Sequence, residues 1–216
     1  MRKIFNKAKT MFITFEGIEG SGKTTQIRHA MEFLKQKGKD CLMTREPGGT
    51  ITGQKIRSIL LDPESNGMDP STELLLYFAD RAEHVNKIIN PALSAGKTVL
   101  CDRYYDATKA YQGFARGLNM DLLDRLHKLI IHDLKPDITI LLDLDPKTGL
   151  SRAWKQINEG QRAGVETRFE KETLDFHDKV RNGYLELARI EAKRFKIIDA
   201  SNDENQVKKD IIKALS

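Results

Sequence analysis

The feature that most constrains this chain is a glycine-rich turn that directly follows a short apolar run. Residues 11–16 read MFITFE, and residues 17–24 read GIEGSGKT, which matches the P-loop pattern G-x-x-x-x-G-K-S/T. In such a turn the backbone N–H groups converge on an anion, and the following helix adds the positive end of its dipole. The sequence therefore predicts a strand, a phosphate-binding loop and a helix, in that order.

Two side chains of this loop have expected roles at a nucleotide. Lys23 is expected to reach the β- and γ-phosphates, and the Thr24 hydroxyl is expected to bind Mg²⁺. The residues expected around the ATP phosphates are Gly17, Ile18, Glu19, Gly20, Ser21, Gly22, Lys23, Thr24 and Thr25. A switch GTPase is disfavoured, because NKII at 86–89 lacks the Asp of a guanine-reading NKxD motif. A large motor ATPase would need a longer chain.

Four more apolar runs are predicted to form buried parallel strands. They are residues 40–45, 97–102, 137–143 and 195–199. Helical patterns lie between the strands, at residues 22–37, 70–90 and 168–192. This alternation predicts a doubly wound α/β fold. We expect a single domain over residues 11–216, preceded by a basic N-terminal extension at 1–10.

The formal charge of +5 is unevenly placed, which argues against a nucleic-acid partner. Most of it comes from the N-terminal extension, at Arg2, Lys3, Lys7 and Lys9. No apolar run approaches the ~20 residues of a membrane-spanning helix. The two cysteines, Cys41 and Cys101, lie in predicted apolar strands, which indicates buried, reduced thiols in a cytoplasmic protein.

Four polar stretches are candidates for a second phosphate site. They are TREPGGT (44–50), LLLYFADRAEH (74–84), CDRYYDATKAYQG (101–113) and INEGQRAGVETR (157–168). The carboxyl ends of parallel strands line the crevice of an open α/β sheet, so we expect these residues to converge there. The stretch 157–168 has two glycines and alternating charges, and it is either an ordinary loop or a lid over a reacting centre.

FEGIEGSGKTTQ, REPGGT, ADRAEH and DRYYDATKAYQG together closely resemble the thymidylate kinase family over about residues 11–200. The resemblance implies a three-layer α/β P-loop nucleoside monophosphate kinase fold, in which helices flank a five-stranded parallel sheet and a short lid covers the site. It implies an enzyme that transfers the γ-phosphoryl group of ATP to dTMP, with Mg²⁺, to give dTDP and ADP for dTTP synthesis. The expected ligands are ATP and dTMP, with no nucleic-acid or membrane partner, and the expected assembly is a homodimer.

The resemblance also assigns an acceptor site. The residues that it places at dTMP are Glu19, Arg45, Pro47, Tyr77, Arg81, Arg103, Thr108, Tyr111 and Gln112. Tyr77 stands where the family usually has a Phe that stacks on thymine, and periodicity alone would make it a core aromatic. The family often has a cis peptide at the bond Glu46–Pro47, and Arg45 serves either the acceptor or the fold.

Mg²⁺ is expected at Thr24 and Asp102, although Asp143 is a rival by pattern. The catalytic group is expected to contain Lys23, Arg103, Arg162 and Asp102. Phosphoryl transfer needs an extra cation, which members of the resembled family place either in the P-loop or in the lid. The variable P-loop positions 18–21 contain no basic residue, so the resemblance implies a bacterial-type member with this cation in the lid.

Arg162 is the best candidate for the lid cation, and Arg168 and Arg152 are the alternatives. Thr167 stands before Arg168 where the family commonly has Asp. Glu19 is left with several options: it bonds the nucleotide sugar, pairs with an arginine of the lid or of the Asp102-Arg103 pair, or faces solvent.

Two other functions remain open from the sequence. One is a kinase for a different monophosphate such as dUMP, because the thymine methyl accounts for only ~1–3 kcal/mol of selectivity. The other is a non-catalytic ATP-binding module, against which the intact Lys23, Thr24 and Asp102 argue.

Overall fold

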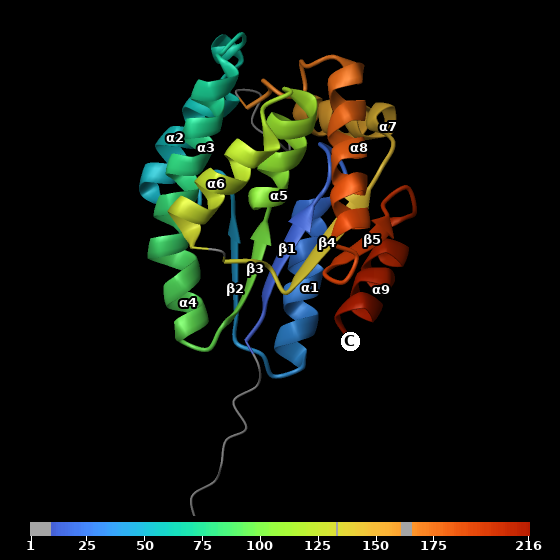
Figure 1. The fold of residues 1–216 in the computed structure, drawn as a ribbon. Helices are drawn as coiled ribbons and strands as arrows, with labels where there is room; N and C mark the ends of the chain where they lie inside the picture. The colour runs from blue at the N-terminus through green and yellow to red at the C-terminus, as the bar shows by residue number, and fades with distance from the viewer. Residues whose placement is uncertain (1–9, 133, 161–165) are drawn as a thin grey trace, which may run out of the picture.

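The fold is built on a parallel sheet at the centre of the molecule. The computed structural model describes residues 10–132, 134–160 and 166–216. The strands are β1 (Phe12–Glu16), β2 (Cys41–Arg45), β3 (Thr98–Asp102), β4 (Ile138–Asp143) and β5 (Phe195–Asp199). They form a five-stranded sheet in the order β2-β3-β1-β4-β5, and every neighbouring pair is parallel (Figure 1). The predicted five-stranded parallel α/β sheet is therefore confirmed, with strand bounds that agree to within one residue.

Helices cover both faces of the sheet. They are α1 (Lys23–Gln36), α2 (Ile51–Leu61), α3 (Pro70–His84), α4 (Asn90–Ser94), α5 (Tyr105–Thr108), α6 (Met120–Ile131), α7 (Pro146–Asn158), α8 (Leu174–Ile190) and α9 (Glu204–Leu215). Helices α1 and α9 pack against each other on one face, and α4, α5 and α8 lie on the other (Figure 1). This arrangement follows from crossovers of one hand, because the chain reverses direction across the sheet after β2.

The edges of the sheet are less buried than the sequence led us to expect. Every residue of β1, the central strand, is buried, but Met43 of β2 and Ile197 of β5 are exposed. The reason is position, because β2 and β5 are the two edge strands and lack a neighbour on one side. The expected burial of Cys41 is therefore wrong, since it lies half-buried at the start of β2, whereas Cys101 of β3 is buried. Both cysteines are free thiols.

Two predicted helices have different bounds in the structure. The segment expected as one helix at 70–90 is α3, followed by a π-helical stretch at Val85–Ile89 and then α4. The helix expected at 168–192 begins only at Leu174, because the Thr173 side chain accepts a hydrogen bond from the backbone N–H of Phe176 and caps it there. Within the described ranges, no helix is both long and apolar enough to cross a bilayer.

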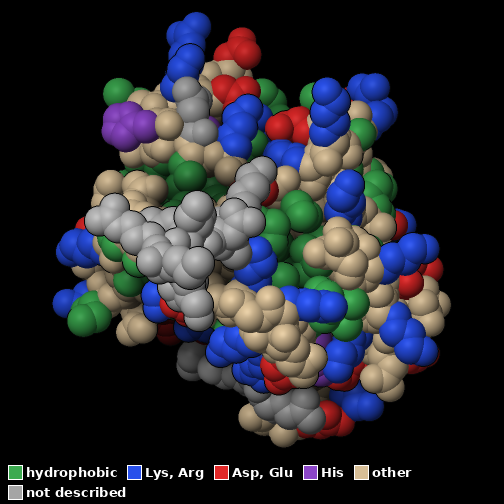
Figure 2. Space-filling model, turned by 90° about the horizontal axis from the view of Figure 1, so that it is seen from below, with side chains coloured by type: hydrophobic (Ala, Val, Ile, Leu, Met, Phe, Trp, Pro, Cys, Tyr) green, Lys and Arg blue, Asp and Glu red, His purple; other side chains and the backbone are tan. Residues whose placement is uncertain are grey.

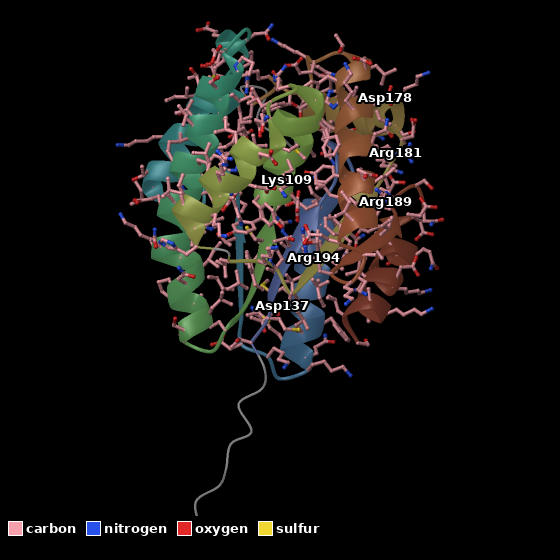
Figure 3. The ribbon with its side chains drawn as sticks, viewed as in Figure 1. Lys109, Asp137, Asp178, Arg181, Arg189 and Arg194 are labelled. Atoms are coloured by element: carbon pink, nitrogen blue, oxygen red, sulfur yellow. The ribbon has the colours of Figure 1, made fainter. Side chains whose placement is uncertain are left out.

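The strands place their carboxyl ends at one edge of the sheet, where the P-loop and the loops after β2 and β3 meet. Figure 2 shows the molecule from the opposite end, where Lys and Arg side chains are scattered among acidic and polar ones. Arg181, labelled on α8 in Figure 3, donates to both carboxylate oxygens of Asp143 at the end of β4. Because the P-loop and the loops after β2 and β3 meet at the carboxyl edge of the sheet, the functional site is expected there.

Candidate active site

A cleft of about 560 Å³ opens at the carboxyl edge of the sheet. This volume lies within the range that small-molecule sites occupy. All of the residues that the sequence placed at the acceptor line it: Glu19, Arg45, Pro47, Tyr77, Arg81, Arg103, Thr108, Tyr111 and Gln112. Three of the four predicted polar stretches, 44–50, 74–84 and 101–113, therefore meet at the cleft. Residues 161–165 of the fourth lie outside the described residues, and the rest of 157–168 does not line the cleft. The binding role of each residue stays a prediction.

The P-loop forms one end of the cleft. Gly20 has a positive φ of 70°, and a Cβ atom there would lie 2.0 Å from the backbone oxygen of Gly149 in α7, so the loop needs glycine at this point. The Lys23 ammonium donates to the backbone oxygens of Gly17 at 3.0 Å and Ile18 at 2.7 Å. Burial and the nearby Arg103 charge lower the pKa of Lys23 to about 8.

The loop residues divide into two groups. Those that line the cleft are Glu19, Gly20, Gly22, Lys23, Thr24 and Thr25. Gly17, Ile18 and Ser21 lie beneath them, and the Ser21 hydroxyl donates to the Ile18 backbone oxygen at 2.8 Å. These three residues shape the turn rather than face the cleft with their side chains.

Thr24 and Asp102 come together, as a magnesium site requires. The Thr24 hydroxyl donates to Oδ2 of Asp102 at 3.1 Å, and both residues line the cleft. A hydroxyl and a carboxylate are hard oxygen donors that suit Mg²⁺, which usually keeps several waters and needs few protein ligands. Accordingly, the described residues contain no cluster of three or more His, Cys, Asp or Glu that could enclose a metal.

Asp143, the rival for this role, is engaged elsewhere. Its two carboxylate oxygens accept hydrogen bonds from Arg181 of α8, at 2.7 and 2.9 Å. It is also absent from the residues that line the cleft. The geometry therefore favours Asp102.

Arg81 is a buried cation that still has donor capacity. Its Nε donates to Glu46 Oε2 at 2.7 Å and one terminal nitrogen, NH2, donates to the Tyr104 backbone oxygen at 3.2 Å. The other terminal nitrogen, NH1, is buried and has no partner in the described part of the chain. Because Arg81 lines the cleft, this nitrogen is available to a ligand there.

Glu46, which sequence reasoning missed, holds Arg81 in place. It also lies 2.9 Å from Nδ1 of His84, and the peptide bond before Pro47 is cis, as the resemblance implied. Burial opposes ionisation of this carboxyl, but Arg81 and His84 outweigh it, and the pKa of Glu46 is lowered. Its signal in the sequence was its place inside REPGGT.

Arg103 projects into the cleft from an uncommon backbone conformation. Its φ is 66°, in the left-handed region that non-glycine residues rarely adopt and that clusters at functional sites. Its guanidinium group lies 2.8 Å from Glu19 Oε1 and 3.2 Å from the Tyr184 hydroxyl. The group also lies over the ring of Tyr111, 4.9 Å from its centroid. The option that Glu19 pairs with the arginine of the Asp102-Arg103 pair is therefore confirmed.

The two tyrosines at the acceptor end differ in burial. Tyr111 is 5% exposed, and its ring packs edge-on against Phe169 and Phe176. Tyr77 is half-buried, packs partly against the core and lines the cleft. Tyr77 is thus partly a core aromatic and partly a residue of the cleft wall, so its position is compatible with both roles that the sequence allowed it.

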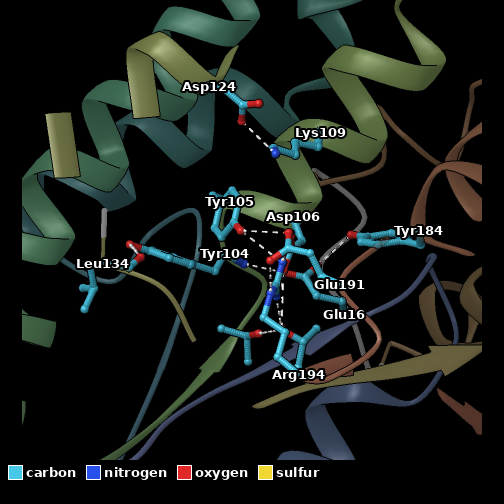
Figure 4. A network of polar contacts seen from close by, with 12 residues as sticks. Glu16, Tyr104, Tyr105, Asp106, Lys109, Asp124, Leu134, Tyr184, Glu191 and Arg194 are labelled. Atoms are coloured by element: carbon cyan, nitrogen blue, oxygen red, sulfur yellow. Dashed lines mark hydrogen bonds and ion pairs between the residues drawn. The ribbon is translucent and has the colours of Figure 1, made fainter. Parts of the chain in front are cut away.

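A buried polar network around Glu16 and Asp106 was not foreseen (Figure 4). Glu16, at the end of β1, accepts from the Tyr104 backbone N–H at 2.8 Å and from the Tyr184 hydroxyl at 2.7 Å. Burial and the neighbouring Asp106 carboxylate raise the pKa of Glu16 to about 8. Arg194 binds both oxygens of Asp106, at 2.7 and 2.8 Å. Glu16 could have been noticed as an acid that ends an apolar run, but nothing marked Arg194.

The candidate lid arginines are placed very differently. Arg162 lies outside the described residues. Arg168 is 2% exposed and its guanidinium group lies 2.6 Å from Glu73 Oε2. Arg152 donates to the Ala200 backbone oxygen at 2.9 Å. Arg168 and Arg152 are thus both held by neighbouring groups, and the assignment of the lid cation to Arg162 stays a prediction.

Comparison with known proteins gives the family. The thymidylate kinase family model matches residues 15–211. A thymidylate kinase of Desulforapulum autotrophicum is 54% identical over 206 residues, which cover 95% of this chain and 91% of that protein. One of Desulfosudis oleivorans is 55% identical over 205 residues, or 95% and 96% of the two chains. The crystal structure of thymidylate kinase from Ehrlichia chaffeensis matches with a TM-score of 0.76 and 36% identity, over 96% of this chain and 99% of that one. The fold is therefore that of the P-loop nucleoside monophosphate kinases, and this chain belongs to the thymidylate kinase family.

Proposed function

We propose that this protein transfers the γ-phosphoryl group of ATP to dTMP and releases ADP and dTDP. One observation carries this proposal beyond family membership. A single cleft is lined both by the P-loop with Lys23 and by Arg81 and Arg103. Two anions can therefore be held facing one another, as transfer between two phosphates requires.

ATP binds through the P-loop. The backbone N–H groups of the loop and the N-terminus of α1 surround its phosphates, and Lys23 turns from the loop carbonyls to the β- and γ-phosphates. Thr24 and Asp102 would hold Mg²⁺, and the ion would supply positive charge that compensates the phosphates.

dTMP occupies the other end of the cleft. Arg103 binds its phosphate with a planar fork of donors, which suits phosphate oxygens. Arg81 and Thr108 face the base with a buried nitrogen and a buried hydroxyl that have no other partner among the described residues. Tyr77 stacks on the base, and Pro47 and Arg45 complete the wall.

The reaction needs no nucleophile from the protein. An ionised oxygen of the dTMP phosphate attacks the γ-phosphorus in line, the bond to the β,γ-bridging oxygen breaks, and ADP carries away that electron pair. Lys23, Arg103 and the lid residue Arg162 compensate the charge on the moving group. The lid at about 157–168 closes and excludes water that would hydrolyse ATP.

The test is a coupled ADP-release assay with dTMP, dUMP, dCMP and AMP as acceptors, with ATP hydrolysis in the absence of acceptor as the control. We expect dTMP to give the highest kcat/KM, and Mg²⁺ removal to abolish turnover. A higher kcat/KM with dCMP or AMP than with dTMP would contradict the substrate. No turnover with any acceptor would contradict the enzymatic function.

We also infer that the protein is a cytoplasmic homodimer. Helices α3 and α6 pack side by side and expose apolar side chains, among them Leu75, Leu122 and Leu129, which are 58%, 47% and 72% exposed. A partner that covers such side chains would stabilise the assembly. The free thiols of Cys41 and Cys101 suit a reducing compartment. Sedimentation equilibrium tests the dimer, and a purely monomeric species would contradict it.

A further inference from the structure

We propose that Glu73 determines which pyrimidine the acceptor site takes, because it fixes the orientation of the Gln112 side-chain amide. This inference rests on the proposed function and adds to it a positioning residue for base selection. Sequence reasoning assigned no role to Glu73, which lies on α3 one turn before Tyr77 and two turns before Arg81.

Glu73 is completely buried and surrounded by donors. The Gln112 amide nitrogen lies 2.7 Å from Glu73 Oε1, and the Arg168 guanidinium group lies 2.6 Å from Oε2. Arg116 approaches the same Oε2 at 3.3 Å. The relative exposure of the Glu73 side chain is 0%, so no bulk water replaces these partners.

A carboxylate with this environment can only accept hydrogen bonds. The amide of Gln112 must therefore turn its NH₂ group toward Glu73, and its carbonyl oxygen must point the other way. With the opposite orientation, two oxygen acceptors would face each other in a buried site, which is strongly unfavourable. The orientation is thus dictated by chemistry and not only by the fit of the side chain.

The carbonyl that results belongs to the cleft wall. Gln112 lines the cleft, and no hydrogen bond within the described residues uses its side-chain oxygen. Arg81 NH1 and the Thr108 hydroxyl lie in the same wall, also without partners in the described part of the chain. The wall therefore presents one fixed acceptor together with a cationic donor.

This polarity distinguishes two classes of pyrimidine. Thymine and uracil have a hydrogen on N3 and an oxygen at C4, so they offer a donor to Gln112 and an acceptor to Arg81. Cytosine has a lone pair on N3 and an amino group at C4, which reverses both. A site with buried polar groups rejects a base that leaves them unpaired much more strongly than it rejects a missing methyl group. The ligand class is thus the 2,4-dioxopyrimidine monophosphates, with Glu73 as the residue that sets the preference.

The decisive variant is Glu73→Gln, which keeps the shape but can either donate or accept, so Gln112 is free to reverse. We expect the ratio of kcat/KM for dTMP to that for dCMP to fall at least about tenfold. Affinities of dTMP, dUMP and dCMP, measured by calorimetry without ATP, should show the same change. Glu172→Gln is the matched control, because Glu172 also pairs with Arg116 but does not touch Gln112, and its ratio should stay at the wild-type value.

Loss of the Arg168 contact in Glu73→Gln would slow all acceptors alike, so it cancels from the ratio. An unchanged ratio in this variant would overturn the role of Glu73. If the variant fails to fold, Gln112→Met removes the carbonyl from the cleft and should weaken dTMP but not dCMP, and equal effects on both would overturn the proposal. A wild-type protein that binds dTMP in preference to dCMP but turns over neither would contradict the proposed reaction and leave base selection testable by calorimetry.

Discussion

Glu19 of the P-loop and Arg103, which follows β3, form a partly buried ion pair, with 2.8 Å between Oε1 and the guanidinium nitrogen. The hydroxyl of Tyr111 donates to the same oxygen at 2.6 Å. Burial opposes ionisation of this carboxyl, but the charges of Arg103 and Lys23, together with His177, outweigh it and lower the pKa of Glu19. The acid thus joins the P-loop to two residues of the proposed acceptor site.

Replacing Glu19 by Gln should therefore weaken the use of dTMP, the acceptor, more than the use of ATP, the donor. The amide can still accept a hydrogen bond, but it leaves the charge of Arg103 without its partner. We expect kcat/KM for dTMP to fall about 10–100-fold, with a much smaller change in KM for ATP. Initial rates with each substrate varied in turn measure this, with Glu32→Gln on the exposed side of α1 as control. Equal losses for both substrates would contradict it.

The hydroxyl and the ring of Tyr111 should have separate effects. Tyr111→Phe loses the bond to Glu19 but keeps the ring, so acceptor KM should rise while the preference for dUMP over UMP persists. We expect the Tyr111 ring to crowd the 2′-hydroxyl of a ribonucleotide, so Tyr111→Ala should reduce that preference. It should also lower stability by about 3–5 kcal/mol, since the ring is 5% exposed in the core. If Tyr111→Phe alone abolishes the preference for the deoxynucleotide, the ring is not the group that disfavours the 2′-hydroxyl.

Arg162→Ala should lower kcat by about 10³-fold or more with little change in ATP affinity, if it provides the lid cation. Arg152→Ala is a useful comparison, because that side chain is bound to the Ala200 carbonyl, and its kcat should change far less. Single-turnover rates and ATP affinity separate the two effects. A wild-type kcat in Arg162→Ala together with a large loss of kcat in Arg152→Ala would show that Arg152, and not Arg162, provides the cation.

Arg168→Ala should reduce stability instead of acting on the chemical step alone. It removes one partner of a buried pair with Glu73, and such losses cost about 3–5 kcal/mol. Urea unfolding at neutral pH measures the free energy of unfolding. A variant with wild-type stability and a collapsed kcat would show that Arg168 leaves Glu73 during the reaction.

His177 should make the stability of the protein depend on pH. Its Nε2 lies 3.0 Å from the Phe169 backbone oxygen, and its Nδ1 lies 3.4 Å from Glu19 Oε2, so both nitrogens face acceptors. Burial alone would lower the pKa of His177, but Glu19 outweighs it and the pKa is raised above 6.5. A raised folded-state pKa stabilises the protein fully at pH below about 6.5, and this contribution disappears as pH rises through the folded-state value.

The melting temperature of wild type and His177→Gln, measured between pH 5 and 9, tests this. The difference between them should be largest at the acidic end and shrink as the pH rises. Parallel curves for the two proteins would show that His177 is not charged in the folded state.

Much of the site could be predicted from the sequence because its determinants are local. A run of apolar residues specifies a strand, glycines permit the turn at Gly20, and parallel strands must end at one edge. These rules were enough to bring Lys23, Asp102 and Arg103 to one cleft, and they need no knowledge of what packs around it. The resemblance added the acceptor residues, among them Arg81 and Gln112.

The tertiary structure alone decided which charges meet. Glu73 and Arg168 are 95 residues apart, and Arg194 and Asp106 are 88 apart, so no pattern in the sequence links them. It also decided that β2 lies at an edge, which leaves Met43 exposed although its run is apolar. The physical reason is that periodicity and turn chemistry act over a few residues, whereas burial and ion pairing depend on the packing of the whole chain.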